Sequence, residues 1–199
     1  MNILVVYAHP SENSFTYQVK ESFIKGLAEA GHNVAVSDLY KMNFSETFTE
    51  SEYLREAFYD EKKPVPEDVL SEQCKINSAD AIAFIYPVFW TEAPAKLVGW
   101  FQRVWTYGFA YGDNPQMKTL EKAVFLVTMG GTLEDKIRQE QAEAMKTVML
   151  GDRISTRAKK TEFVVFDRMT RGYGNDETRF RRAEQFLKQA YQIGFEIQK

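Results

Sequence analysis

Few residues of this chain are of types that could do chemistry, and one group of them follows the first apolar run. The stretch YAHPSENSFT, residues 7–16, places His9, Ser14 and Thr16 where a strand composition gives way to a helical one. A helix N-terminus favours an anion, because its N–H groups are unpaired and its dipole is positive there. The stretch predicts either an ordinary loop with a Ser or Asn helix cap, or a cradle for the phosphate of a cofactor.

A second group is the apolar loop in YPVFWTEAPAK, residues 86–96. Val88, Phe89 and Trp90 follow one another between Pro87 and Thr91. Large apolar side chains are unfavourable in water at a strand exit, so we expect them to cover another helix, a partner chain or a flat ligand.

A third group is the glycine loop in TMGGTLED, residues 128–135, which begins Thr128, Met129, Gly130 and Gly131. Adjacent glycines permit positive φ and a close backbone approach to a ligand. Glycine pairs are common in turns, so this pair indicates a ligand site only if its loop faces the other two loops.

The hydrophobic pattern supplies a scaffold that brings the three loops together. Five β-branched or aromatic segments, typical of strands covered on both faces, span residues 3–7, 34–38, 81–86, 123–128 and 162–166. Helical patterns span residues 14–31, 66–80, 93–108, 132–150 and 175–198. This alternation predicts an α/β fold with a doubly wound, five-stranded parallel sheet in three layers.

Five strands, and no G-x-G-x-x-G after the first, favour the flavodoxin-like strand order 2-1-3-4-5. Ligands then bind beyond the carboxyl ends of the first and third strands, where the three loops are expected. Residues 41–66 predict a surface excursion with a short helix at 50–58, so we expect one domain over residues 1–199.

Composition excludes several classes of function. The 199 residues carry 25 basic and 28 acidic side chains, a net charge of −3, which gives no reason to expect nucleic acid or an anionic membrane as a partner. The N-terminal apolar run is too short for a signal peptide or a membrane span. A single cysteine, Cys74, excludes an internal disulfide and a cysteine-built metal site. We expect a cytoplasmic protein with no metal and a structural Cys74.

Four motifs in order make the chain similar to the NAD(P)H:quinone oxidoreductases of flavodoxin-like fold. AHPSENSF resembles their flavin phosphate loop, and DLYKMNF, residues 38–44, resembles the segment after their second strand. YPVFWTEAPAKLVGWFQRVWTYGFAYG, residues 86–112, is similar to the stretch with their isoalloxazine contacts and part of their dimer interface. TMGG resembles their T-T-G-G loop. The likeness extends over almost the whole chain.

The resemblance implies a homodimer with a flavin at each subunit interface. The residues implied to meet the flavin phosphates and ribityl chain are His9, Ser14, Phe15 and Thr16. Those implied to hold one side of the ring are Pro87, Val88, Phe89, Trp90 and Thr91. Those implied at its pyrimidine end are Thr128, Met129, Gly130 and Gly131.

The resemblance also implies roles for Tyr111 and Arg179. Tyr111, in FAYG, would come from the partner subunit as a wall of the substrate pocket. Arg179, in NDETRFRR, would lie near the cofactor, with an exposed helix arginine as the alternative.

The sequence departs from the long members of this family in two ways. They carry a Tyr and a His shortly after the Gly-Gly loop for proton handling, whereas TLEDKIRQEQAEA contains neither. Lys136, Arg138 or Gln139 would have to supply a donor, and Lys136 and Tyr111 are the candidate catalytic residues beside the flavin itself. The long members' C-terminal extension is also missing, which leaves both FAD and FMN open. We expect FAD from the AHP loop.

The expected activity is hydride transfer from NADPH or NADH through the flavin to a quinone, nitro or azo compound. One pocket used in turn by donor and acceptor predicts ping-pong kinetics. The first alternative is an ancillary regulatory flavoprotein of a potassium-efflux transporter. The second is a one-electron carrier like flavodoxin, which is disfavoured because VFW and FAYG indicate a covered pocket.

Overall fold

Five parallel strands pair in the order β2-β1-β3-β4-β5, which confirms the predicted flavodoxin-like topology. The computed structural model describes residues 1–170 and 175–199. The strands are β1 (Asn2–Tyr7), β2 (Asn33–Asp38), β3 (Ala81–Pro87), β4 (Leu120–Thr128) and β5 (Ala158–Phe166). β4 and β5 begin earlier than the apolar pattern predicts: their pairing starts at Leu120 and Ala158 and continues through charged residues, of which Lys159 and Glu121 lie 2.7 Å apart.

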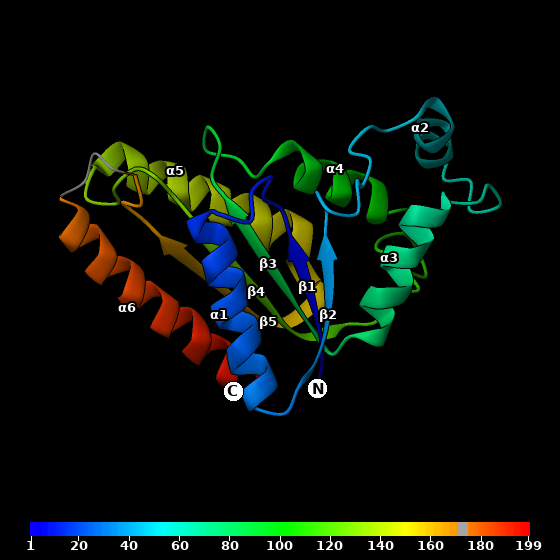
Figure 1. Cartoon of the computed structure of the whole chain (residues 1–199). Coiled ribbons are helices and arrows are strands. Elements are labelled where there is room, and N and C mark those ends of the chain that lie inside the picture. The colour runs from blue at the N-terminus through cyan, green and yellow to red at the C-terminus, as the bar shows by residue number, and fades with distance from the viewer. Residues whose placement is uncertain (171–174) are drawn as a thin grey trace.

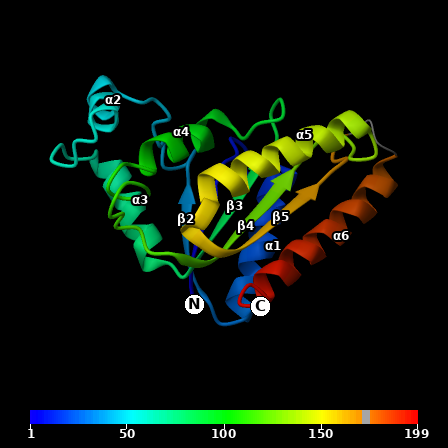
Figure 2. The ribbon, with the colours of Figure 1, turned by 180° about the vertical axis from the view of Figure 1, so that it is seen from behind.

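Helices cover both faces of the sheet. On one face α1 (Phe15–Glu29) and α6 (Asp176–Phe195) lie side by side (Figure 1). On the other face lie α3 (Glu67–Ser78), α4 (Ala95–Val104), α5 (Lys136–Lys146) and the π-helical segment Thr147–Ile154 (Figure 2). Central strand β3 is buried on both faces, so alternate residues of one strand supply both halves of the core.

α1 forms where the sequence predicts it. Val19, Phe23 and Leu27, spaced by four, are fully buried against the sheet. The helix ends in a Schellman motif, in which the N–H of His32 donates to Leu27 and that of Gly31 donates to Ala28. Gly31 has φ +79°, a conformation that glycine adopts without a Cβ clash.

The expectation that all five strands are covered on both faces is wrong for β2 and β5. Val36, at the middle of β2, is 41% exposed, and most of β5 is half-buried or exposed. Both strands lie at the edges of the sheet, where a helix that packs on the central strands leaves part of the edge uncovered. Cys74 is exposed on α3, the helix that the charged stretch around it predicts.

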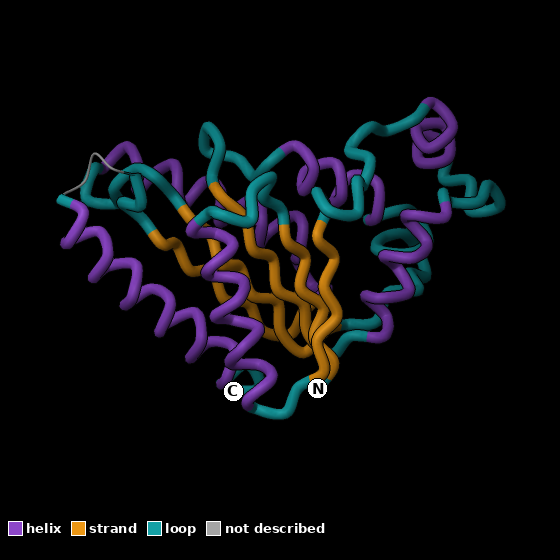
Figure 3. Tube along the Cα trace, viewed as in Figure 1, coloured by secondary structure: helices purple, strands orange, loops and turns teal. Residues whose placement is uncertain are grey.

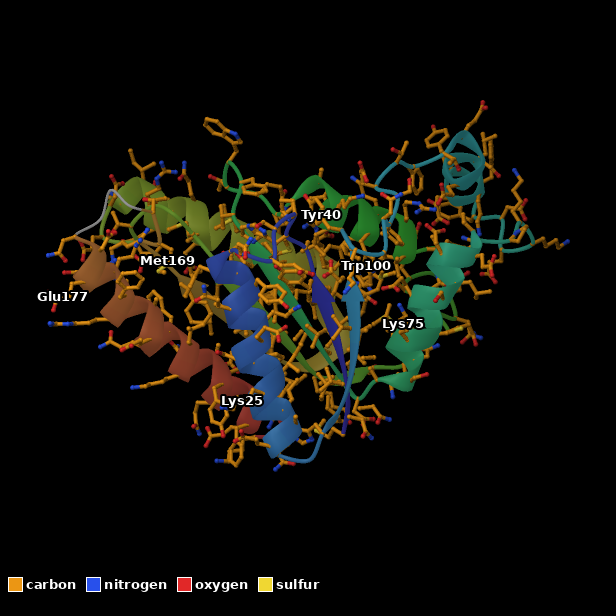
Figure 4. The ribbon with its side chains drawn as sticks, viewed as in Figure 1. Lys25, Tyr40, Lys75, Trp100, Met169 and Glu177 are labelled. Atoms are coloured by element: carbon orange, nitrogen blue, oxygen red, sulfur yellow. The ribbon has the colours of Figure 1, made fainter. Side chains whose placement is uncertain are left out.

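The polar segment that follows β2 is fastened to the rest of the molecule. It contains α2 (Glu50–Ala57), close to the predicted helix at 50–58. Arg103 of α4 donates to the Glu52 carboxylate at 2.7 Å, to the Asp68 carboxylate at 2.6 Å and to the Ser45 carbonyl at 2.9 Å. These bonds hold the excursion against α3 and α4. Figure 4 shows Trp100 between these two helices, where its indole N–H donates to Glu72 at 2.9 Å.

Two predicted helices end differently. α4 stops at Val104 instead of 108, and α5 begins at Lys136 after an Asp135 cap and passes into the π-helical segment. In residues 1–170 and 175–199, no helix is both long enough and apolar enough to cross a membrane.

Candidate functional site

The loops after β1, β3 and β4 meet at the carboxyl edge of the sheet, as the sequence predicts (Figure 3). Two backbone bonds extend the strand pairing into these loops. The N–H of Ala8 donates to Ile85 at 3.1 Å, and the N–H of Val88 donates to Thr128 at 2.8 Å. The three segments therefore leave the sheet as neighbours.

The first loop ends at the capped N-terminus of α1. Ser14 is the N-cap, and its Oγ accepts the N–H of Tyr17 at 3.0 Å. Phe15 and Thr16 are the first two residues of the helix, so their N–H groups have no acceptor within it. The predicted helix cap and the predicted phosphate cradle are therefore compatible, because Ser14 caps the helix while the N–H groups of Phe15 and Thr16 stay available to an anion.

His9 is oriented by the loop that follows it. Its Nδ1 lies 2.9 Å from the N–H of Ser11 and 3.0 Å from the carbonyl of the same residue. Burial lowers the pKa of the His9 ring below its usual value of 6.5, so the ring is neutral at neutral pH. In the tautomer in which Nδ1 accepts the Ser11 N–H, the neutral ring carries its proton on Nε2 and can donate it to a ligand; in the other tautomer Nδ1 donates to the Ser11 carbonyl.

Thr16 and Thr128 are in contact through their hydroxyl groups. Both side chains are buried, and the two hydroxyl oxygens lie 2.7 Å apart. The packing of α1 against the end of β4 brings the two hydroxyls together, and their contact uses one of the two hydroxyl hydrogens. Thr16 also offers its backbone N–H at the helix start.

The second loop is a strained two-residue turn. Phe89 and Glu92 exchange backbone hydrogen bonds of 2.8 and 3.0 Å, and the residues between them, Trp90 and Thr91, have φ of +52° and +66°. Positive φ at both central positions defines a type I′ turn, which glycine and asparagine normally form. Trp90 is fully exposed at its tip. Non-glycine residues in this region cost about 1–3 kcal/mol each and cluster at functional sites.

The third loop uses its glycines for close approach. Neither Gly130 nor Gly131 has positive φ, so that part of the expectation is wrong. A Cβ on Gly130 would lie 2.5 Å from Cγ2 of Thr170, in the loop after β5. The Thr170 hydroxyl and the N–H of Arg168 donate to the carbonyls of Gly130 and Gly131 at 3.2 and 2.7 Å. Among the described residues, the N–H groups of these two glycines have no acceptor.

The second and third loops line an open pocket of about 820 Å³. Ligand pockets of about 300–1,000 Å³ are typical of small-molecule sites. The predicted residues that line it are Val88, Trp90, Thr91, Met129, Gly130 and Gly131. Those that were not among the predicted contacts are Asp135, Ile137, Arg138, Gln141, Met145 and Thr170. Most of these belong to α5, and of them the sequence singled out only Arg138, as one of three residues that could supply a donor.

Other predicted residues lie outside this pocket. The Lys136 side chain is 88% exposed and 3.9 Å from Glu140, one helical turn away. Arg179 is half-buried and pairs with Asp176 of its own helix at 3.1 Å, and it does not line this pocket. Tyr111 donates its hydroxyl to Glu56 of α2 at 2.8 Å and does not line the pocket of its own chain.

The tyrosines near this edge are protonated at neutral pH. Burial raises the pKa of Tyr7, the last residue of β1, to about 12. Burial raises the pKa of Tyr86 further, and burial together with the Glu56 carboxylate raises the pKa of Tyr111. A tyrosine in this state can donate a hydrogen bond but does not serve as a base.

Comparison with known proteins gives a consistent set of relatives. Residues 1–190 match the family described as Flavodoxin-like fold. A solved structure of an NAD(P)H:quinone oxidoreductase from Methanothermobacter marburgensis is 42% identical, covers 100% of this chain and 98% of its own, and has a TM-score of 0.91.

Curated relatives are longer than this chain. NAD(P)H dehydrogenase (quinone) 1 from Cavia porcellus is 36% identical over 65% of this chain and 53% of its own length. Ribosyldihydronicotinamide dehydrogenase (quinone) from Rattus norvegicus is 35% identical over 66% of this chain and 64% of its own. The matched part thus spans between about half and two thirds of these proteins.

Proposed function

Because the chain belongs to the flavodoxin-like family of NAD(P)H:quinone oxidoreductases, we propose that it transfers two electrons from NAD(P)H through a bound flavin to a quinone. Similar flat acceptors, such as nitro and azo compounds, belong to the same proposal. The observation that carries it is the meeting of three loops at one sheet edge. The second and third loops line a pocket of about 820 Å³, and the contact between Thr16 and Thr128 joins the α1 N-terminus to the strand that leads into the third loop.

The phosphate end of a flavin fits the first loop. The N–H groups of Phe15 and Thr16 and the Nε2–H of His9 are donors without competing carboxylates in the loop's hydrogen-bond pattern. A phosphate at a helix N-terminus is stabilised by both the amides and the dipole. We assign His9, Ser14, Phe15 and Thr16 to this end of the cofactor.

The ring end fits the pocket. We assign Pro87, Val88, Phe89, Trp90 and Thr91 to one side of the ring, and Thr128, Met129, Gly130 and Gly131 to its pyrimidine end. The free N–H groups of Gly130 and Gly131 are the donors that a pyrimidine carbonyl requires. When bound, the flavin supplies the hydride acceptor that no side chain of the chain provides.

The proposed flavin cofactor and hydride donor are taken from the resemblance to the family. We propose FAD, with FMN as the alternative, because the AHP loop is similar to that of FAD-binding relatives. The donor stays open between NADPH and NADH, since the pocket lining carries both a basic side chain, Arg138, and an acidic one, Asp135. The proposal includes a cytoplasmic location, with which the single cysteine is compatible.

The proposal includes a homodimer. Tyr111 is bonded to Glu56, and Tyr53, Phe58 and Tyr59 on or directly after α2 are exposed beside it. Exposed aromatic groups of this kind favour a partner surface. A second copy would cover them and bring its Tyr111 to the pocket as a wall for the acceptor.

One pocket would serve both substrates. NAD(P)H gives up a hydride from C4 and leaves before the quinone enters. The quinone becomes a hydroquinone by gaining two electrons and two protons, one proton from the hydride and one from solvent. Such alternation predicts parallel double-reciprocal lines with menadione and NADPH, and intersecting lines would exclude the shared pocket.

The experiment that tests the function is an absorption spectrum of the purified protein, followed by heat release and chromatography of the cofactor. Oxidised-flavin bands that bleach anaerobically with NADPH or NADH support the proposal, and the released cofactor distinguishes FAD from FMN. A colourless protein that neither binds added flavin nor oxidises NAD(P)H would contradict it.

A further inference from the structure

Arg138 lies beside the glycine loop in the candidate pocket. It is in the first turn of α5 and lines the same pocket as Gly130 and Gly131. Its Nε is 3.6 Å from the position that a Cβ atom on Gly131 would occupy. This is an ordinary van der Waals distance, so the guanidinium lies directly against the glycine loop.

The charge of Arg138 is not neutralised by a carboxylate. In residues 1–170 and 175–199, no acidic group lies within ion-pair distance of it, and its Nη1 donates to the neutral amide oxygen of Gln141 at 2.9 Å. The nearby carboxylate of Asp135 caps α5, accepting the N–H groups of Ile137 and Arg138 at 2.8 and 3.3 Å. The guanidinium thus contributes positive charge to the pocket.

Lys136 makes a useful contrast. It is two residues earlier on the same helix, but its side chain is in solvent and close to Glu140. It does not line the pocket, whereas Arg138 and Gln141 do. Of the three polar residues that could replace the relatives' Tyr and His, Gln139 is also excluded, because its amide donates to the Leu133 carbonyl at 2.6 Å.

The backbone of the glycine loop adds to this positive character. The carbonyls of Gly130 and Gly131 already accept hydrogen bonds from the Thr170 hydroxyl and the Arg168 N–H, whereas the N–H groups of the two glycines have no acceptor among the described residues. Two amide hydrogens and one guanidinium are then the donors that this part of the lining offers to a negative charge.

We infer that Arg138 compensates the negative charge that two-electron reduction brings to the flavin, an inference that rests on the proposed function. A hydride carries two electrons and one proton, so its transfer from C4 of NAD(P)H adds one net negative charge to the pocket until a proton follows. A guanidinium is always protonated, so Arg138 holds that charge without having to release a proton. This role requires neither the Tyr nor the His of the longer relatives.

The test compares R138Q, R138K and the control K136Q, which removes a positive charge from the same helix outside the pocket. The two-electron reduction potential of the bound flavin is measured by equilibration with a reference dye, and the dissociation constant of the oxidised flavin is measured by fluorescence. R138Q is expected to weaken binding of the reduced flavin about tenfold relative to the oxidised flavin, which lowers the potential by about 30 mV. R138K should retain most of the potential, and K136Q should match the wild type.

Three results would overturn the inference while leaving the proposed function intact: an R138Q potential equal to that of the wild type, an equal shift in K136Q, or a raised KM for NADPH with no change in potential. The last would mean that Arg138 binds the phosphates of the donor. A wild type that binds neither FMN nor FAD would instead overturn the proposed function, and this inference with it. Arg138 is exposed, so its substitution leaves the core unchanged.

Discussion

The hydroxyl oxygens of Thr16 and Thr128 lie 2.7 Å apart, between the first turn of α1 and the last residue of β4. Both side chains are buried, and 112 positions separate them in the sequence. The bond therefore fixes the helix start of the first loop relative to the strand that leads into the glycine loop. It holds together the two ends of the proposed flavin site without requiring either hydroxyl to contact the ligand.

This pair predicts a non-additive pattern of stability. Thr16→Val or Thr128→Val alone leaves one buried hydroxyl without a partner and should lower the free energy of unfolding by about 1–3 kcal/mol. The double variant removes both hydroxyls while retaining the shape and should be close to the wild type. Urea unfolding of the four proteins measures the effect. Single losses that simply add in the double variant would show that the bond does not couple the two segments.

Ser14 allows the helix cap to be separated from the phosphate site. Ser14→Ala removes the acceptor of the Tyr17 N–H and should cost about 1 kcal/mol of stability, together with flavin affinity. Ser14→Asp keeps the cap, since Asp caps as well as Ser, but places a carboxylate where the phosphate is proposed. We expect wild-type stability and at least tenfold weaker FMN binding, measured by fluorescence titration. Unchanged FMN affinity in Ser14→Asp would exclude a phosphate from this helix start.

The fold could be predicted from the sequence because most helices and strands are marked by their own residues. β3 is apolar at every position and proved fully buried, and α1 has a cap, a four-residue apolar spacing and a terminal glycine. The edge strands were harder to predict. β2 contains Val34 and Val36, as a central strand would, and only the strand order determines that it lies at an edge of the sheet, where Val36 is 41% exposed.

The site was predictable as three loops but not as a set of contacts. Thr170 could not be linked to Gly130 from the sequence, because their contact depends on how the loop after β5 folds back over the glycine loop. The pairing of Thr16 with Thr128 is similarly a tertiary contact. The turn at Trp90 and Thr91 contradicts local preference, since neither residue favours positive φ, and such conflicts are expected at functional sites.

The His9 ring predicts a dependence of stability on pH. Its pKa in the folded protein is below the usual 6.5, so the unfolded chain binds a proton more readily than the folded one. Stability is therefore complete above the usual pKa and falls as the pH drops below about 6.5 toward the lowered value. His9→Asn keeps an acceptor for the Ser11 N–H and cannot titrate.

The measurement is urea unfolding of the wild type and His9→Asn at about pH 7.5 and about pH 5. The wild type should lose more stability between the two conditions, and the difference reports on His9 because His32, whose pKa burial also lowers, is present in both proteins. At neutral pH His9→Asn should bind FMN more weakly, since the Nε2–H is lost. Identical pH profiles would show that the ring is equally easy to protonate in both states.

Gly130 and Thr170 offer a test of how the glycine loop is held. Gly130→Ala would place Cβ 2.5 Å from the Thr170 Cγ2, closer than any van der Waals contact, so the loop after β5 must move and stability should fall by about 1–3 kcal/mol. Thr170→Ser removes that methyl and keeps the hydroxyl that donates to Gly130. The double variant should therefore regain both stability and flavin affinity, as measured by urea unfolding and fluorescence titration. A double variant as unstable as Gly130→Ala would mean that the glycine is needed for its backbone and not for the approach of Thr170.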